Sequence, residues 1–257
     1  MADWNDPRRT GMGVGATPGM DGQLGERTVM DEGLRKYMLG VYNYMAMAVL
    51  LTGIVAGLVA QTDFVYTMFN PETGAPTLLY WGMVAAPFIL VMWLQFRIFH
   101  MSVVAAQTAY WVYAALVGAS IASIFIAYTP ISIAQTFFAT AAAFAGLSLW
   151  GYTTKKDISG WGTFLFMGIW GLFAAMLLNV LVFKSPLADL LMSGVGVVIF
   201  AAFTAYKTQA IRNIYFEVRG DAELVAKTTI FGALHLYMSF INMFLMLLRF
   251  MGVARGE

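Results

Sequence analysis

Long stretches without Asp, Glu, Lys or Arg are the feature that most constrains this chain. Six such stretches occur, at 37–62, 73–96, 98–154, 158–183, 190–206 and 228–248. A helix needs roughly 20 apolar residues to cross the hydrocarbon core of a bilayer, and the stretch 98–154 is long enough for two helices. The sequence therefore predicts an all-α membrane protein with seven transmembrane helices.

The longest stretch divides at Pro130, because proline cannot donate a backbone hydrogen bond and disfavours helical geometry in the residue before it. The composition agrees with a chain that lies almost wholly in the membrane, since only 11% of residues are charged, against about 25% in soluble domains. The expected spans are 38–61, 78–98, 103–127, 131–151, 161–183, 187–206 and 229–249.

The segments outside the spans are short, apart from the N-terminus. Residues 1–36 are polar and predict a largely disordered cytoplasmic tail, in which 25–36 has the spacing of a short surface helix. Residues 37–252 form the predicted transmembrane domain, and 253–257 a short outer tail. An orientation with the N-terminus inside places 12 of the 15 Lys and Arg residues on the cytoplasmic side, which is the side where basic loop residues accumulate.

The residues offer little for catalysis. The chain has no cysteine, and its two histidines, His100 and His235, lie on different expected spans. All 14 acidic residues fall in loops, in tails or at span margins, whereas ion-coupled carriers place a carboxylate inside the bundle. We expect no enzyme activity, metal site or cofactor. The segment 207–227 mixes both charges, which predicts a solvated loop and no nucleic-acid partner.

The last expected span carries a stripe of polar residues on one face. His235, Ser239, Asn242 and Arg249 recur there at helical spacing. Because lipid offers no hydrogen-bond partner, this face must turn inward. Two interpretations stay open: the stripe hydrogen-bonds neighbouring helices, or it lines an ion or water path. Small residues four apart, Gly53 with Gly57 and Gly118 with Ala122, predict close helix contacts.

Several segments together resemble the bacterial branch of the Bax inhibitor-1 family. They are Pro87 in the second span, GYTTKKD at 151–157, FTAYKTQ at 203–209 and GALHLYMSFINMFLMLLR at 232–249. The resemblance covers about residues 30–252. It implies six helices around a central seventh, a place in the bacterial inner membrane, and a passive calcium leak gated by pH through two hydrogen-bonded aspartates.

This chain departs from the family at both aspartate positions. Lys207 replaces the acid of the pattern Tyr-Asp-Thr-Gln, and Ser239 replaces the acid of Leu-Tyr-Leu-Asp-Phe-Ile-Asn. An ammonium and a hydroxyl cannot share a proton as two close carboxylates do, and a fixed positive charge repels Ca²⁺. We therefore predict that the calcium leak is lost or altered. Lys207 either faces the path or extends to the lipid headgroups.

The candidate pore or gate residues are therefore Lys207, Ser239, His235, Asn242 and Arg97. His235 is a candidate for a remaining pH response, because its ordinary pKa lies near 6.5 and it is one turn from Ser239, although a lone histidine on a packed helix is more often structural. The alternative function is that of an accessory membrane subunit, with a membrane-bound AAA protease or a larger membrane complex as its partner besides the lipid bilayer.

Overall fold

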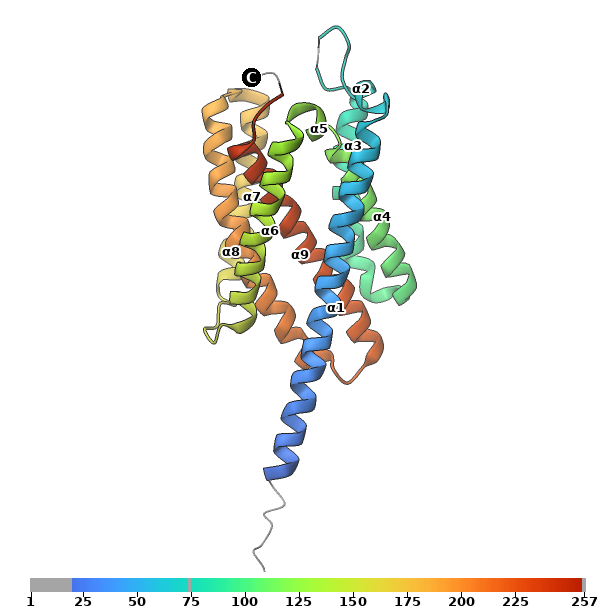
Figure 1. Cartoon of the computed structure of the whole chain (residues 1–257), viewed down its shortest axis with the longest axis vertical. Helices are drawn as coiled ribbons and strands as arrows, with labels where there is room; N and C mark the ends of the chain where they lie inside the picture. Colours follow the sequence, from blue (N-terminus) through green and yellow to red (C-terminus); the bar gives the residue numbers. More distant parts are fainter. Residues whose placement is uncertain (1–19, 74, 256–257) are drawn as a thin grey trace, which may run out of the picture. The chain divides into compact units, whose positions relative to one another are not determined.

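The described part of the chain is helical and contains the seven expected spans. The computed structural model describes residues 20–73 and 75–255 (Figure 1). Over this range the only extended pairings are the isolated bridges Phe69 to Pro76 and Tyr128 to Ala254. The elements are α1 (Met20–Ala60), α2 (Phe64–Thr67), α3 (Leu78–Arg97), η2 (Ile98–His100), α4 (Val103–Ile121), α5 (Ile124–Ala127), α6 (Pro130–Thr153), α7 (Trp161–Leu178), η3 (Asn179–Phe183), α8 (Pro186–Val218) and α9 (Ala222–Met251). Seven of these segments are long and apolar enough to cross a membrane, so the fold prediction is confirmed.

Three helices run well past the charge-free stretches. Helix α8 continues to Val218 and α9 begins at Ala222, so most of the loop predicted at 207–227 is helical. Helix α1 begins at Met20, upstream of the short helix expected at 25–36. The rest of the tail predicted for residues 1–36 lies outside the described residues. These helices are longer than the expected spans because a charged side chain ends a membrane span, but not the backbone hydrogen bonding of the helix.

Proline begins two of the spans, as the division at Pro130 predicted. The Thr129 hydroxyl accepts a hydrogen bond from the Ser132 amide and Pro130 opens α6. Ser185 and Pro186 repeat this arrangement at the start of α8. Proline is well placed in a first helical turn, where its missing N–H would have no partner in the helix. Asp221 caps α9 by accepting from the Glu223 and Leu224 amides, at 2.8 and 3.1 Å.

Close helix contacts occur at some of the small residues but not at others. A Cβ added to Gly118 of α4 would lie 2.7 Å from the Thr52 carbonyl oxygen of α1, and one added to Gly151 of α6 would clash with the Ala205 backbone of α8. The packing role predicted for Gly118 is therefore confirmed. A Cβ at Gly53 or Gly57 would meet nothing within 4 Å, so the close contact predicted for that pair is wrong.

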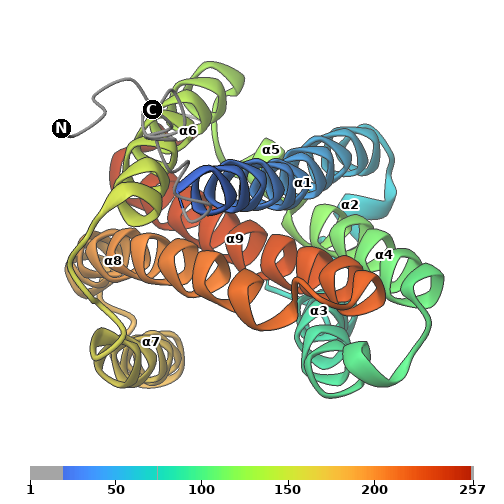
Figure 2. The ribbon, with the colours of Figure 1, turned by 90° about the horizontal axis from the view of Figure 1, so that it is seen from below.

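Helix α9 is by far the most buried span. Of the residues in its apolar window, 72% are buried, against 17–33% in the other six. It packs against α8, α6 and α4, while α7 packs mainly against α8. Figure 2 shows α7 on the far side of α8 from α9. The inward turn expected of the polar stripe agrees with this burial, and a ring of six helices around α9 stays a prediction.

The glycine contacts predict different effects of one substitution at two sites on α6. Gly151→Leu should destabilise the protein by about 1–3 kcal/mol or more, because the side chain has no room against α8. Gly146→Leu is the matched control: its Cβ meets nothing within 4 Å, so stability should change by no more than about 0.5 kcal/mol. Thermal unfolding in detergent, followed by tryptophan fluorescence, measures both. Equal melting temperatures would contradict the contact.

Candidate ion path: the buried polar side chains of α6, α8 and α9

The polar stripe of α9 bonds to its own helix. The Nδ1 atom of His235 lies 2.9 Å from the Phe231 carbonyl oxygen and Ser239 Oγ donates to the His235 carbonyl at 3.0 Å. Asn242 Nδ2 donates to the Met238 carbonyl at 2.8 Å. Each partner lies four residues earlier, the pattern by which a polar side chain is satisfied inside a helix. These bonds do not join helices, and they use donor groups of Ser239 and Asn242 while the oxygen atoms of these side chains keep their lone pairs.

Lys207 lies within α8 and not at its end. Its ammonium lies 5.1 Å from the centre of the Phe203 ring and 5.8 Å from that of Tyr206. Such cation–π contacts are worth about 0.5–2 kcal/mol, depending on how far the charge is removed from water. Lys207 is therefore held beside aromatic rings of its own helix.

The structure joins two of the five candidate residues directly. Ser239 and His235 are buried one turn apart in α9, where the Ser239 hydroxyl donates to the His235 carbonyl. Asn242 is half-buried on the same helix. Lys207 lies on α8 and forms no ion pair among the described residues. Arg97 is exposed at the end of α3, and within residues 20–73 and 75–255 it makes no hydrogen bond to a side chain and no ion pair. A place for Arg97 on an ion path therefore has no support from its surroundings.

A chain of hydroxyl groups that the sequence analysis missed joins three spans. The Tyr42 hydroxyl of α1 lies 2.6 Å from Ser148 Oγ of α6, which lies 3.0 Å from Thr208 Oγ1 of α8. Thr208 donates onward to the Thr204 carbonyl at 2.9 Å. The signal for this chain was a second polar stripe with a period of four on α6, whose buried members are Ser132, Thr136, Thr140 and Ser148.

A second missed contact fastens α9 to α1 and α4. Thr52 Oγ1 donates to the Ala114 carbonyl of α4 at 3.0 Å and lies 2.6 Å from the Tyr237 hydroxyl of α9. Since the threonine proton is used on Ala114, the tyrosine donates the other bond. Both side chains are almost fully buried. One interpretation of α9 was that its polar stripe hydrogen-bonds to neighbouring helices. The structure shows such a bond at Tyr237 instead of at the stripe.

Lys227 is a buried charge within the segment expected to be a solvated loop. It is 7% exposed, and its Nζ atom lies 2.8 Å from the Glu223 carboxylate and 3.2 Å from the Phe99 carbonyl oxygen. The expectation of a solvated loop is therefore wrong here. Because the lysine is one turn from its acid on α9 and also reaches η2, it holds the start of α9 against the end of α3.

The other end of the bundle is closed by the chain after α9. Thr129 and Val253 pair through their backbones at 3.2 Å, and the Val253 amide donates to Ser132 Oγ at 2.9 Å. Nearby, Arg249 lies 3.6 Å from Asp189 with both side chains partly exposed, so this ion pair contributes no more than about 1 kcal/mol to the stability of the fold.

Tyr128 lies at the same end of the bundle. Burial raises the pKa of its hydroxyl above the ordinary value, although the positive charge of Arg249 opposes this.

The electrostatics of the interior are set by basic and neutral groups. Among the described side chains, residues 32–73 and 75–255, Lys227 is the one buried charged residue, and no Asp or Glu is buried. The same residues contain no cluster of three or more His, Asp or Glu with the spacing of a metal site. These side chains provide no shared-proton pair of carboxylates and no ligand set for Ca²⁺, which prefers several oxygen ligands including carboxylates.

Fold and interior together define a seven-span α-helical membrane protein with no buried carboxylate among its described side chains. The sequence profile of the family described as "Inhibitor of apoptosis-promoting Bax1" matches residues 34–256. The chain therefore belongs to the Bax inhibitor-1 family, as its resemblance indicated.

Bacterial relatives match along most of the chain. An uncharacterized protein of Caulobacter vibrioides is 41% identical over 230 residues, which are 88% of this chain and 92% of the relative. The inner membrane protein YbhL of Escherichia coli strain K12 is 40% identical over 224 residues, 87% of this chain and 94% of YbhL. Protein RP147 of Rickettsia prowazekii is 40% identical over 225 residues, 88% of this chain and 92% of that protein.

The two kinds of hydrogen bond on α9 predict different costs of losing a hydroxyl. Ser239→Ala should change stability by less than about 0.5 kcal/mol, because the His235 carbonyl keeps its backbone partner in the helix. Thr52→Val should cost about 0.6–1.7 kcal/mol, the range for side-chain bonds between membrane helices. Thermal unfolding in detergent distinguishes them. A larger loss for Ser239→Ala than for Thr52→Val would contradict the assignment of the stripe.

Proposed function

We propose that this protein keeps the channel-like scaffold of its family in a sealed, non-enzymatic form without the pH-gated calcium leak. The observation that carries the proposal is the make-up of the α9 stripe: His235, Ser239 and Asn242 hydrogen-bond to carbonyls of their own helix, and no Asp or Glu is buried among the described side chains. An ion that leaves water needs several replacement ligands along its path, and Ca²⁺ prefers a set that includes carboxylates, which this stripe does not supply.

Charge supports the same conclusion. The resemblance places Lys207 and Ser239 at the two positions where the family carries acids, and Lys207 belongs to α8, which packs against the interior helix α9. A fixed positive charge beside the path repels a divalent cation, most strongly where water is scarce. Without two carboxylates that share a proton, the site also lacks the switch that makes a leak sensitive to pH in the acidic to neutral range.

We place the protein in a bacterial inner membrane, with the N-terminus cytoplasmic and the C-terminus outside. The name of YbhL, an inner membrane protein, supports the location. The orientation rests on the basic residues, because it places 12 of the 15 on the cytoplasmic side, either in the N-terminal tail or toward the cytoplasmic ends of the spans. A sealed scaffold in this location would act through contacts with other membrane proteins, and a membrane-bound protease or a larger complex is the class of partner we propose.

Calcium flux into liposomes tests the proposal. We expect the purified chain to give no more Ca²⁺ entry than empty liposomes between pH 5 and pH 8. The double variant Lys207→Asp with Ser239→Asp should gain an entry rate that changes over this range, because two facing carboxylates share a proton that leaves as the pH rises.

The single variants Lys207→Asp and Ser239→Asp are the controls, because one carboxylate has no partner with which to share a proton. Chloride flux measured in the same liposomes tests whether the positive charge of Lys207 lets the protein conduct anions instead of Ca²⁺. Calcium entry that varies with pH through the unmodified chain would contradict the proposal, and so would chloride flux well above that of empty liposomes.

A further inference from the structure

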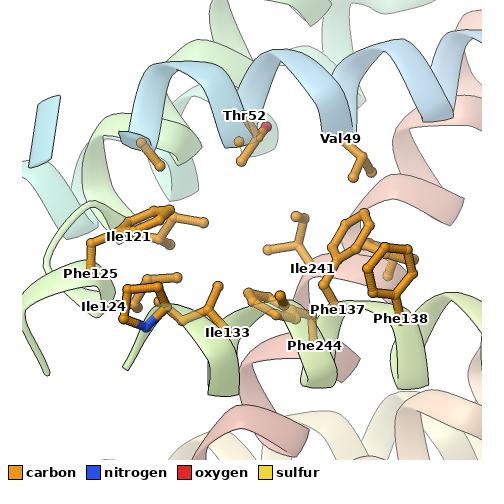
Figure 3. Close-up of a pocket in the computed structure, with 15 residues that line it drawn as sticks. Val49, Thr52, Ile121, Ile124, Phe125, Ile133, Phe137, Phe138, Ile241 and Phe244 are labelled. Carbon is orange, nitrogen blue, oxygen red and sulfur yellow. The ribbon is translucent and has the colours of Figure 1, made fainter. Parts of the chain in front are cut away.

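An apolar groove lies between α1 and α6, outside the polar interior. Its volume is about 300 Å³, and the outer parts of α4 and α5 and one face of α9 complete its walls. Figure 3 shows Thr52 and Val49 of α1 on one side and Ile133, Phe137 and Phe138 of α6 on the other, all bordering the same space. Phe138 and Gly53 are exposed, so the groove opens to the surroundings of the helices.

The walls of the groove offer no hydrogen bond. Thr52 is the one lining residue with a polar side chain, and its hydroxyl is used on the Ala114 carbonyl and the Tyr237 hydroxyl. A cavity needs several polar partners to hold water, and apolar cavities of this kind stay dry. Water or an ion is therefore a poor occupant, and an empty space would lose the dispersion contacts of its lining.

The groove depends on a missing side chain at Gly53. A Cβ built at this position meets no atom within 4 Å, although the residue lies on the wall. Gly57, one turn further along α1, has the same freedom but does not line the groove. A larger residue at Gly53 would therefore fill the space without disturbing the contacts between the helices.

The surroundings and the size of the groove identify its occupant. Both α1 and α6 are membrane spans, so the medium beside the opening is lipid hydrocarbon. A packed helix is about 10–12 Å across with its side chains, too thick for a space of this volume. An extended acyl chain is slender enough and matches the apolar lining.

A positive charge lies at the end of the groove. Arg255 follows α9, and its Nη1 atom donates to the Phe125 carbonyl at 2.9 Å while its amide donates to the Ala127 carbonyl at 2.9 Å. Phe125 is itself a lining residue. The exposed guanidinium has five N–H donors and forms no ion pair within residues 20–73 and 75–255, and its planar fork suits the oxygens of a phosphate.

We propose that this groove binds one phospholipid, with an acyl chain between α1 and α6 and the headgroup phosphate on Arg255. The lipid fills the gap that Gly53 leaves and lies beside the bonds by which Thr52 joins α1 to α4 and α9. This role is independent of ion conduction, so the two proposals stand or fall separately.

Native mass spectrometry of the full chain tests the proposal. The chain is reconstituted with phosphatidylglycerol, extracted in mild detergent, and compared with Gly53→Leu and the matched control Gly57→Leu. We expect one retained phospholipid on the wild type and on Gly57→Leu, and at least about tenfold less retention on Gly53→Leu, because leucine occupies the site of the chain. Equal retention by all three, or retained detergent without lipid, would overturn the proposal.

A crosslinking measurement on the unmodified chain keeps the test independent of folding defects. Phosphatidylglycerol with a photoreactive diazirine in its acyl chain should label the peptide containing Ile133 and Phe138 well above helix α3, which also exposes large apolar side chains. Arg255→Gln should lower retention of the lipid in the mass spectra, since glutamine cannot pair with the phosphate charge. Labelling spread evenly over α3 and α6, or retention unaffected by Arg255→Gln, would overturn the assignment.

Discussion

The structure depends on one constraint: a polar group in the membrane must find its partner inside the protein. Helix α9 carries a stripe of such groups and is 72% buried over its apolar window, far more than any other span. Its stripe is satisfied within the helix, as in the bond of Ser239 to the His235 carbonyl. The helix therefore packs against its neighbours mainly through van der Waals contacts, and a few hydrogen bonds between helices, such as the one from Tyr237 to Thr52, add to this packing.

The same constraint separates the interior from the groove. Hydroxyls such as Tyr42, Ser148 and Thr208 pair with one another between α1, α6 and α8, which leaves apolar surfaces to face lipid. Between α1 and α6 those surfaces do not meet, and the space contains no polar group that lacks a partner. A sealed interior and a groove for lipid are therefore two results of satisfying every polar group inside the bundle.

Much of the fold follows from the sequence, because span length and the absence of charge are direct consequences of the bilayer. The ends of α8 and α9 do not follow, since helices continue past the first charge into water. The sequence also shows where a glycine lies but not what packs against it. A Cβ at Gly118 would meet the backbone of α1, whereas a Cβ at Gly53 would meet open space. The spacing of the polar stripe also follows from the sequence, but only the structure shows that its hydroxyl and imidazole bond to carbonyls one turn away.

Access of water to the α9 stripe is the most direct measurement of the central claim, that this stripe is sealed. The chain has no natural cysteine, so Ser239→Cys creates a single thiol at a position that is 1% exposed, and Ser159→Cys creates an exposed reference in the loop before α7. The protein is reconstituted into liposomes that are permeabilised, so that a charged, water-soluble maleimide reaches both faces of the membrane. This reagent should react with Ser239→Cys at least about 100-fold more slowly than with Ser159→Cys, because reaction at the buried position requires local opening of the structure. Similar rates at the two positions would contradict the account.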